Sequence, residues 1–76
     1  MARLPILPAR EVVKGLVRAG FQVVSQRGSH LKLSGLRQGR VLAVIVPLYP
    51  ELPRGLLASI LRQAGMTREE FLALLE

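Results

Sequence analysis

Apolar residues recur with the period of an α-helix near the start of the chain. Between Ala9 and Ala19 they form one stripe, made of Val12, Val13, Leu16 and Val17. Pro8 suits the first turn of such a helix, where its missing N–H costs nothing, and Gly20 suits the position after the last turn. We therefore predict a helix over residues 9–19, in which Gly15 permits close packing at a cost of about 1 kcal/mol relative to Ala.

The middle of the chain changes to strand-like runs separated by short links. The runs cover residues 21–26, 30–34 and 40–46, and the second run alternates polar and apolar side chains as a half-exposed strand does. Turns are predicted at residues 27–29 and 35–39. Links this short join antiparallel strands, because a parallel connection needs about a dozen residues or more. The pattern therefore predicts a three-stranded antiparallel meander.

Helical spacing returns after a proline-rich loop. The prolines between residues 47 and 53 hold this loop extended, and apolar residues over 55–64 then repeat at helical spacing up to Gly65, which ends the helix. Thr67-Arg68-Glu69-Glu70 has the pattern of a capping box and predicts a short last helix. The element order α-β-β-β-α-α indicates an α+β fold in a single domain over residues 1–76, with the helices on one face of the sheet.

The third strand, over residues 40–46, is apolar on both of its faces. The mean hydropathy of the chain, +0.36, is also high for a protein of this size. One interpretation is that a partner covers one face of this strand. The other is that the strand is central in the sheet and is buried by this chain alone.

Composition excludes several classes of protein. A chain of 76 residues is too short for a large enzyme with a deep cofactor cleft. The absence of Cys excludes disulfides and thiolate metal sites, and one His leaves too few nitrogens for a typical zinc site. The sequence therefore predicts no metal and no cofactor. The proline-broken N-terminus does not fit a signal peptide, and the longest apolar stretch is too short for a membrane span. We expect a cytoplasmic protein without a membrane partner.

Positive charge is concentrated in the first two thirds of the chain. Residues 1–50 hold eight Lys and Arg with one acid, Glu11, whereas residues 51–76 hold three Arg and four Glu. A one-sided positive field indicates a polyanion partner, most often a nucleic acid; the alternative is that the charge serves solubility. Three of the cations recur along the predicted first helix and are candidate RNA contacts: Arg10, Lys14 and Arg18. The alternative for this stripe is a solvated face on which Glu11 pairs with Lys14.

Gly28-Ser29-His30, flanked by Arg27 and Lys32, is the strongest candidate for chemistry. A His at a hairpin turn can accept and return a proton, and the two cations can hold a phosphate and stabilise its transition state. Such a site suits RNA, whose 2′-OH is a nucleophile once deprotonated, and it needs no metal. Tyr49, Lys32 or solvent would then supply the second proton-transfer group. The alternative is that His30 is an ordinary polar surface residue.

Aromatic side chains give little support to base stacking. Phe21 and Phe71 fit the core, and Tyr49 stands in the proline-rich loop. Recognition through shape and phosphate contacts therefore fits this chain better than stacking on the sheet.

Four motifs occur in a characteristic order. They are Gly20-Phe21, Arg27-Gly28-Ser29-His30, Val46-Pro47 and Gly55-x-Leu57-x-Ser59-Ile60-Leu61-Arg62-Gln63-Ala64-Gly65. From about residue 9 to residue 73 the chain resembles the HicA (YcfA-like) mRNA interferase toxins. The resemblance implies a double-stranded-RNA-binding-domain-like fold, ribonuclease activity on mRNA that depends on His30, and a HicB-type antitoxin that masks the site. Tyr49 stands where family members often have His, and Leu56 where many have Thr.

The resulting hypothesis is a HicA-like, metal-independent endoribonuclease. In it His30 is catalytic, Gly28 and Ser29 shape the turn, and the remaining supporting residues are Arg27, Lys32 and Tyr49. One alternative is an RNA-binding module without activity. Another is a protein-interaction module that docks through its apolar third strand. The sequence leaves open whether the chain forms a homo-oligomer.

Overall fold

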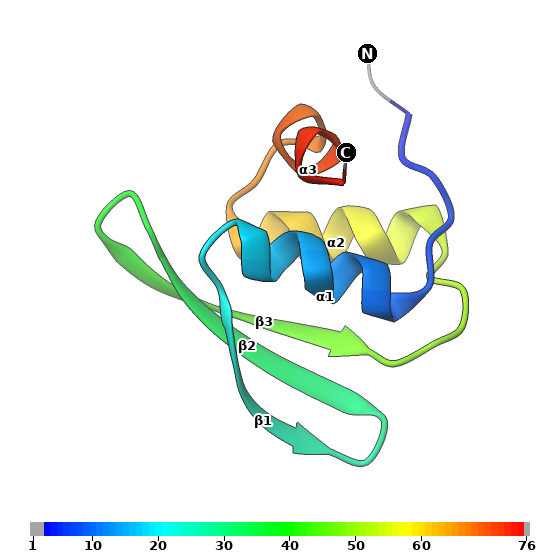
Figure 1. The fold of residues 1–76 in the computed structure, drawn as a ribbon, viewed down its shortest axis with the longest axis horizontal. Helices are drawn as coiled ribbons and strands as arrows, with labels where there is room; N and C mark the ends of the chain where they lie inside the picture. The colour runs from blue at the N-terminus through cyan, green and yellow to red at the C-terminus, as the bar shows by residue number, and fades with distance from the viewer. Residues whose placement is uncertain (1–2, 76) are drawn as a thin grey trace.

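The computed structural model describes residues 3–75, so Met1, Ala2 and Glu76 of the domain expected over 1–76 lie outside the described residues. The elements follow the predicted order, and the α+β class with a three-stranded antiparallel sheet is confirmed (Figure 1). They are α1 (Ala9–Arg18), β1 (Gln22–Arg27), β2 (His30–Arg37), β3 (Arg40–Pro47), α2 (Arg54–Ala64) and α3 (Arg68–Leu74).

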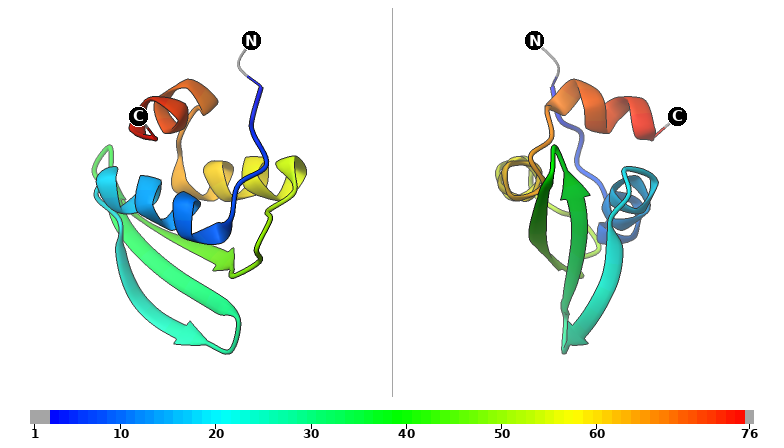
Figure 2. Two further views of the ribbon diagram at one scale, coloured as in Figure 1. Left: turned by 45° about the vertical axis from the view of Figure 1, so that its right-hand side comes forward. Right: turned by 90° about the vertical axis from the view of Figure 1, so that its left-hand side faces the viewer.

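The helices cover one face of the sheet and leave the other face open. Figure 2 shows α1 and α2 on the same side of the strands, with α3 packed on the helices. An ion pair between Arg37 and Glu70 joins α3 to the end of β2. Leu31, Leu33, Val44 and Val46 point from the strands toward the helices and are buried. The residues that alternate with them, such as Lys32 and Ile45, are exposed, so the opposite face of the sheet is open to solvent.

Helix α1 follows the predicted stripe with two differences. Pro8 is the N-cap residue and not part of the first turn, because its ψ of 150° is extended. Val12 and Leu16 are buried, but Val17 is half exposed because it faces away from the sheet. The close packing expected at Gly15 is confirmed, since a Cβ there would lie 2.7 Å from Cε1 of Phe71. The helix therefore seats α3 directly against its backbone.

The second hairpin is tighter than predicted. Its turn contains only Gln38 and Gly39, with φ of 52° and 76°, the two positive values that a type I′ turn requires. The turn predicted over residues 35–39 is therefore too long. Gly35 belongs to β2 because the Phe21 ring packs over it, and a Cβ at that position would lie 2.7 Å from Cδ2 of Phe21.

Strand β2, and not β3, is the central strand of the sheet. The order is β1-β2-β3, so β3 lies at an edge. The interpretation of the third strand as central and buried by this chain is therefore wrong. Val41, Ala43 and Ile45 of β3 are exposed on the open face.

Helix α2 ends, and helix α3 begins, as predicted. Helix α2 begins at Arg54, one residue earlier than predicted, and ends at Ala64, followed by the C-cap residue Gly65, whose φ of 65° is left-handed. The capping box of α3 is confirmed, because the Thr67 hydroxyl accepts from the Glu70 N–H while the Glu70 carboxylate accepts from the Thr67 N–H. The helices in residues 3–75 all lack the length and apolar character needed to cross a bilayer.

The segment before α1 is tied to the loop between β3 and α2. The Leu52 N–H donates to the Leu7 carbonyl at 2.7 Å, and Nε of Arg54 donates to the Leu4 carbonyl at 2.7 Å. The side chains of Leu4 and Leu52 are both buried in the core. The segment therefore closes one end of the molecule and fixes the proline-rich loop.

Candidate functional site

The turn between β1 and β2 is held by two hydrogen bonds. Gly28 has a φ of 59°, a conformation that glycine adopts without strain. Nε2 of Gln26 donates to the Gly28 carbonyl at 3.0 Å. The Leu48 N–H donates to the Ser29 carbonyl at 2.7 Å and joins this turn to the loop after β3. These hydrogen bonds therefore hold the backbone in place just before His30, the first residue of β2.

Three of the predicted site residues come together on the open face of the sheet. His30 and Lys32 alternate with the buried Leu31 and Leu33, so their side chains point away from the helices. The strand register sets Arg27 directly opposite His30. Arg27, His30 and Lys32 line one hollow of about 400 Å³.

Two further residues that line this hollow were not predicted from the sequence. Ser25 and Ile45 lie opposite Lys32 on its two neighbouring strands, and both line the hollow. The sequence does hold a signal for Ser25, because residues two positions apart on a strand, such as Ser25 and Arg27, lie on the same face. A β-bulge between Val23 and Ser25 disturbs the alternation of β1, so a regular register counted across it would be displaced.

The hollow has a cationic side and an aliphatic side. Arg27 and Lys32 supply positive charge, and Ile45 of β3 forms the apolar wall. The carboxylates of Glu11 and Glu70 lie elsewhere, paired with Lys14 at 3.5 Å and with Arg37 at 3.0 Å. The arrangement suits an anion that carries an apolar group beside it.

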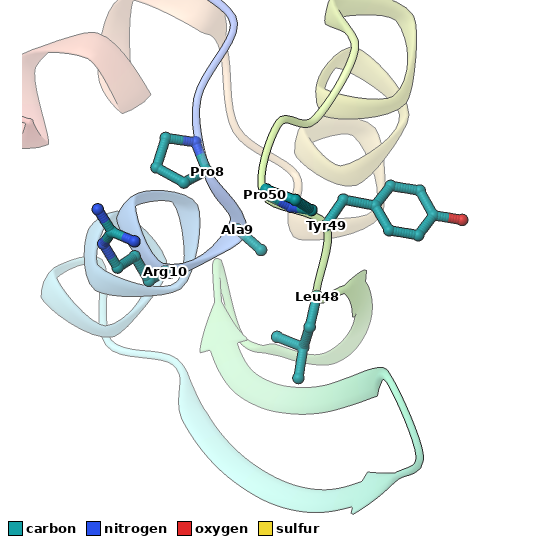
Figure 3. Close-up of a pocket in the computed structure, with 6 residues that line it drawn as sticks. All are labelled: Pro8, Ala9, Arg10, Leu48, Tyr49 and Pro50. Atoms are coloured by element: carbon teal, nitrogen blue, oxygen red, sulfur yellow. The ribbon is translucent and has the colours of Figure 1, made fainter.

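Tyr49 lines a different hollow. This one measures about 280 Å³ and is lined by Pro8, Ala9, Arg10, Leu48, Tyr49 and Pro50. Figure 3 shows the side chains of Arg10 and Tyr49 pointing away from each other. The backbone carbonyl of Tyr49 accepts from the Ala9 N–H at 3.0 Å. The structure thus separates Tyr49 from the hollow of His30, although Leu48 links the two loops.

The basic stripe of α1 is exposed but lies over the covered face of the sheet, away from His30. Lys14 pairs with Glu11, as the solvated-face alternative expects. Nη1 of Arg18 donates to the Leu74 carbonyl at 2.6 Å and so connects α1 to α3. Arg10 reaches the hollow of Tyr49. The structure does not bring these three cations into the hollow of His30.

Glu70 has a lowered pKa. The hydrogen bond from the Thr67 N–H, followed by the hydrogen bond from Arg37, lowers the pKa of Glu70 below its ordinary value of 4.5. This group is remote from the open face and supports the α3 cap. Among residues 3–75, His and acidic side chains do not gather in a group of three or more that could hold a metal ion.

Comparison with known proteins adds a family. Residues 9–66 match the family model described as the HicA toxin of bacterial toxin–antitoxin systems. The matched range contains the hollow of His30 in full, but not the segment before α1 or helix α3. A search of curated proteins gives no match to the chain.

Proposed function

The chain belongs to the HicA toxin family of bacterial toxin–antitoxin systems, and from this premise we propose that it is a cytoplasmic endoribonuclease that cleaves mRNA without a metal. A HicB-type antitoxin neutralises it by covering the open face. The observation that carries the proposal is the hollow in which His30 lies between Arg27 and Lys32.

Substrate binding begins with the two cations. Arg27 presents a planar guanidinium that forms paired hydrogen bonds to a phosphate, and Lys32 adds a mobile point charge from the next strand. As charge develops on the phosphorus oxygens in the transition state, both cations stabilise it. The carboxylates of Glu11 and Glu70, which would repel a phosphate, are held in ion pairs elsewhere.

The proposed reaction is an intramolecular transesterification, in which the phosphorus exchanges the 5′-oxygen of the next nucleotide for the adjacent 2′-oxygen. Neutral His30 accepts the proton of the 2′-OH, and the 2′-oxygen forms a bond to phosphorus as the bond to the 5′-oxygen breaks. Lys32 donates a proton to the departing 5′-oxygen, because it shares the hollow with His30 whereas Tyr49 lines the other one. Proton exchange with water returns His30 to its neutral form and Lys32 to its charged form. The products are a 2′,3′-cyclic phosphate and a 5′-OH.

Gly28 and Ser29 act through the backbone. Gly28 allows the left-handed turn, and the Ser29 carbonyl anchors Leu48. These contacts fix the direction in which the His30 side chain leaves β2.

Cleavage of an RNA oligonucleotide by the purified protein tests the proposal. His30→Ala is expected to lower the rate by about 10²-fold or more, since proton transfer contributes this much to catalysis. Ser34→Ala, a polar change further along β2 and outside the residues lining the hollow, is the control and should cleave normally.

Three further outcomes belong to the same experiment. A 2′-deoxy substitution at the cleaved linkage should block the reaction, and EDTA should not. Equal rates for wild type and His30→Ala would refute the mechanism. RNA binding without cleavage in the wild type would instead support the RNA-binding module without activity.

A further inference from the structure

The open face of the sheet is divided into a polar half and an apolar half. Strand β1 and the start of β2 contribute the charged and polar residues that line the hollow. Strand β3 contributes Val41, Ala43 and Ile45, and Leu36 of β2 lies opposite Val41. Val41 is 75% exposed, Leu36 67% and Ile45 39%. We call these four residues the apolar strip; it runs from the hollow toward the second hairpin.

The backbone of β3 is occupied at the point where the strip meets the hollow. The Ile45 N–H donates to Oε1 of Gln63, from α2, at 3.0 Å. An edge strand whose N–H is taken cannot pair there with a strand from a partner. At Ile45, therefore, the strip offers its side chain for contact and not its backbone.

Resting on the proposed function, we propose that the hollow seats one nucleotide of a single-stranded RNA, with its phosphate at Arg27 and Lys32 and its base against Ile45. The lining of the hollow favours this occupant, because its two cations are complementary to a phosphate and its aliphatic side chain to the attached base. Neighbouring strands lie about 4.8 Å apart, so Lys32 on β2 is one strand spacing from Ile45 on β3 and Arg27 on β1 is two. One nucleotide, with its phosphate and its base, spans this range.

Ile45 is in this view a specificity-determining residue for unpaired RNA. In a duplex the base is stacked and paired within the helix and cannot turn its face to a side chain on the sheet. The unpaired bases of a single-stranded RNA can turn a face to this side chain. The contact needs no aromatic ring, because burying aliphatic surface against a base is itself favourable.

An abasic scan of a short single-stranded RNA tests this contact. Binding is measured by fluorescence anisotropy in the His30→Ala background, which keeps the RNA intact. We expect that removing one particular base weakens binding about three- to tenfold, the gain from covering part of the exposed Ile45 side chain. In an added Ile45→Ala variant the intact RNA should bind about as weakly, and the loss on removing that base should disappear.

A matched control distinguishes this contact from a general loss of apolar surface. Val23 is 49% exposed and lies on β1 opposite the buried Leu33, so it belongs to the covered face of the sheet. Val23→Ala should leave both the affinity and the abasic effect unchanged. Ile45→Thr keeps the branched shape of the side chain and serves as a second test if Ile45→Ala does not fold.

The outcomes also separate this inference from the proposed function. If both Ile45 variants bind RNA and respond to base removal as Val23→Ala does, the contact is refuted while RNA binding stands. The inference also fails if duplex RNA binds as tightly as the single strand. If the wild type neither binds nor cleaves RNA, the proposed function itself is wrong, and the strip belongs to a protein partner.

Discussion

Replacing Gly15 by Ala is expected to destabilise the protein, although alanine is the better helix former. A Cβ at this position would lie 2.7 Å from Cε1 of Phe71 and 3.4 Å from two further atoms of the ring. The ring is fully buried between α3 and the other helices, so it has little room to move aside. The new methyl group therefore has to push α3 away from α1.

The size of the effect follows from two opposing terms. Alanine gains about 1 kcal/mol over glycine within a helix. Overpacking a core by one methyl group costs about 1–3 kcal/mol, and a contact as short as this one belongs in the upper part of that range. We expect a net loss of about 1–2 kcal/mol in the free energy of unfolding. For a chain of this size, each kcal/mol lowers Tm by about 4–8 °C.

Urea unfolding followed by circular dichroism measures this change. Gly55→Ala is the matched control, because Gly55 is also helical but nothing lies within 4 Å of its Cβ position. That variant should be unchanged or slightly more stable. In a Phe71→Leu background, where the smaller side chain leaves room for the methyl group, Gly15→Ala should cost less than it does in the wild type. Our reasoning is refuted if Gly15→Ala is as stable as the wild type.

The remaining predictions concern pH and Tyr49. Because hydrogen bonds from Thr67 and Arg37 lower the pKa of Glu70 in the folded state, the ionised carboxylate stabilises the fold above its unfolded pKa. That contribution disappears as the pH falls through the folded value. The margin of wild type over Glu70→Gln in urea unfolding should therefore shrink as the pH drops below about 4.5; a constant margin would contradict this. Tyr49→Phe should cleave RNA within about twofold of the wild type, because Tyr49 and His30 line different hollows; a loss as large as that of His30→Ala would show a direct role.

Local signals predict most of the elements. The stripe of α1 and the capping box of α3 depend on residues three or four positions apart, and the structure confirms both. The predicted length of the second turn is wrong because Gly35 resembles a loop residue in sequence. It lies in β2 to accommodate the Phe21 ring, and a contact between two residues so far apart leaves no local pattern.

The site is predictable from sequence only along a single strand. The alternation of polar and apolar residues in β2 puts His30 and Lys32 on one face, and the short turn sets Arg27 opposite His30. Ile45 cannot be assigned in the same way. Its place depends on the register between β2 and β3, which the type I′ turn fixes, and the longer predicted turn leaves that register open. The catalytic role of His30 stays a prediction.

The hydrogen bond between the N-terminal segment and α2 also bears on the order of events during folding. Arg54 and Leu4 are joined by a hydrogen bond across 50 positions of sequence, and contacts of such long range form late because a large loop must close first. The hairpins of the meander join residues that are close in sequence. We therefore expect the sheet to form early in folding and the N-terminal segment to bind α2 in a late step.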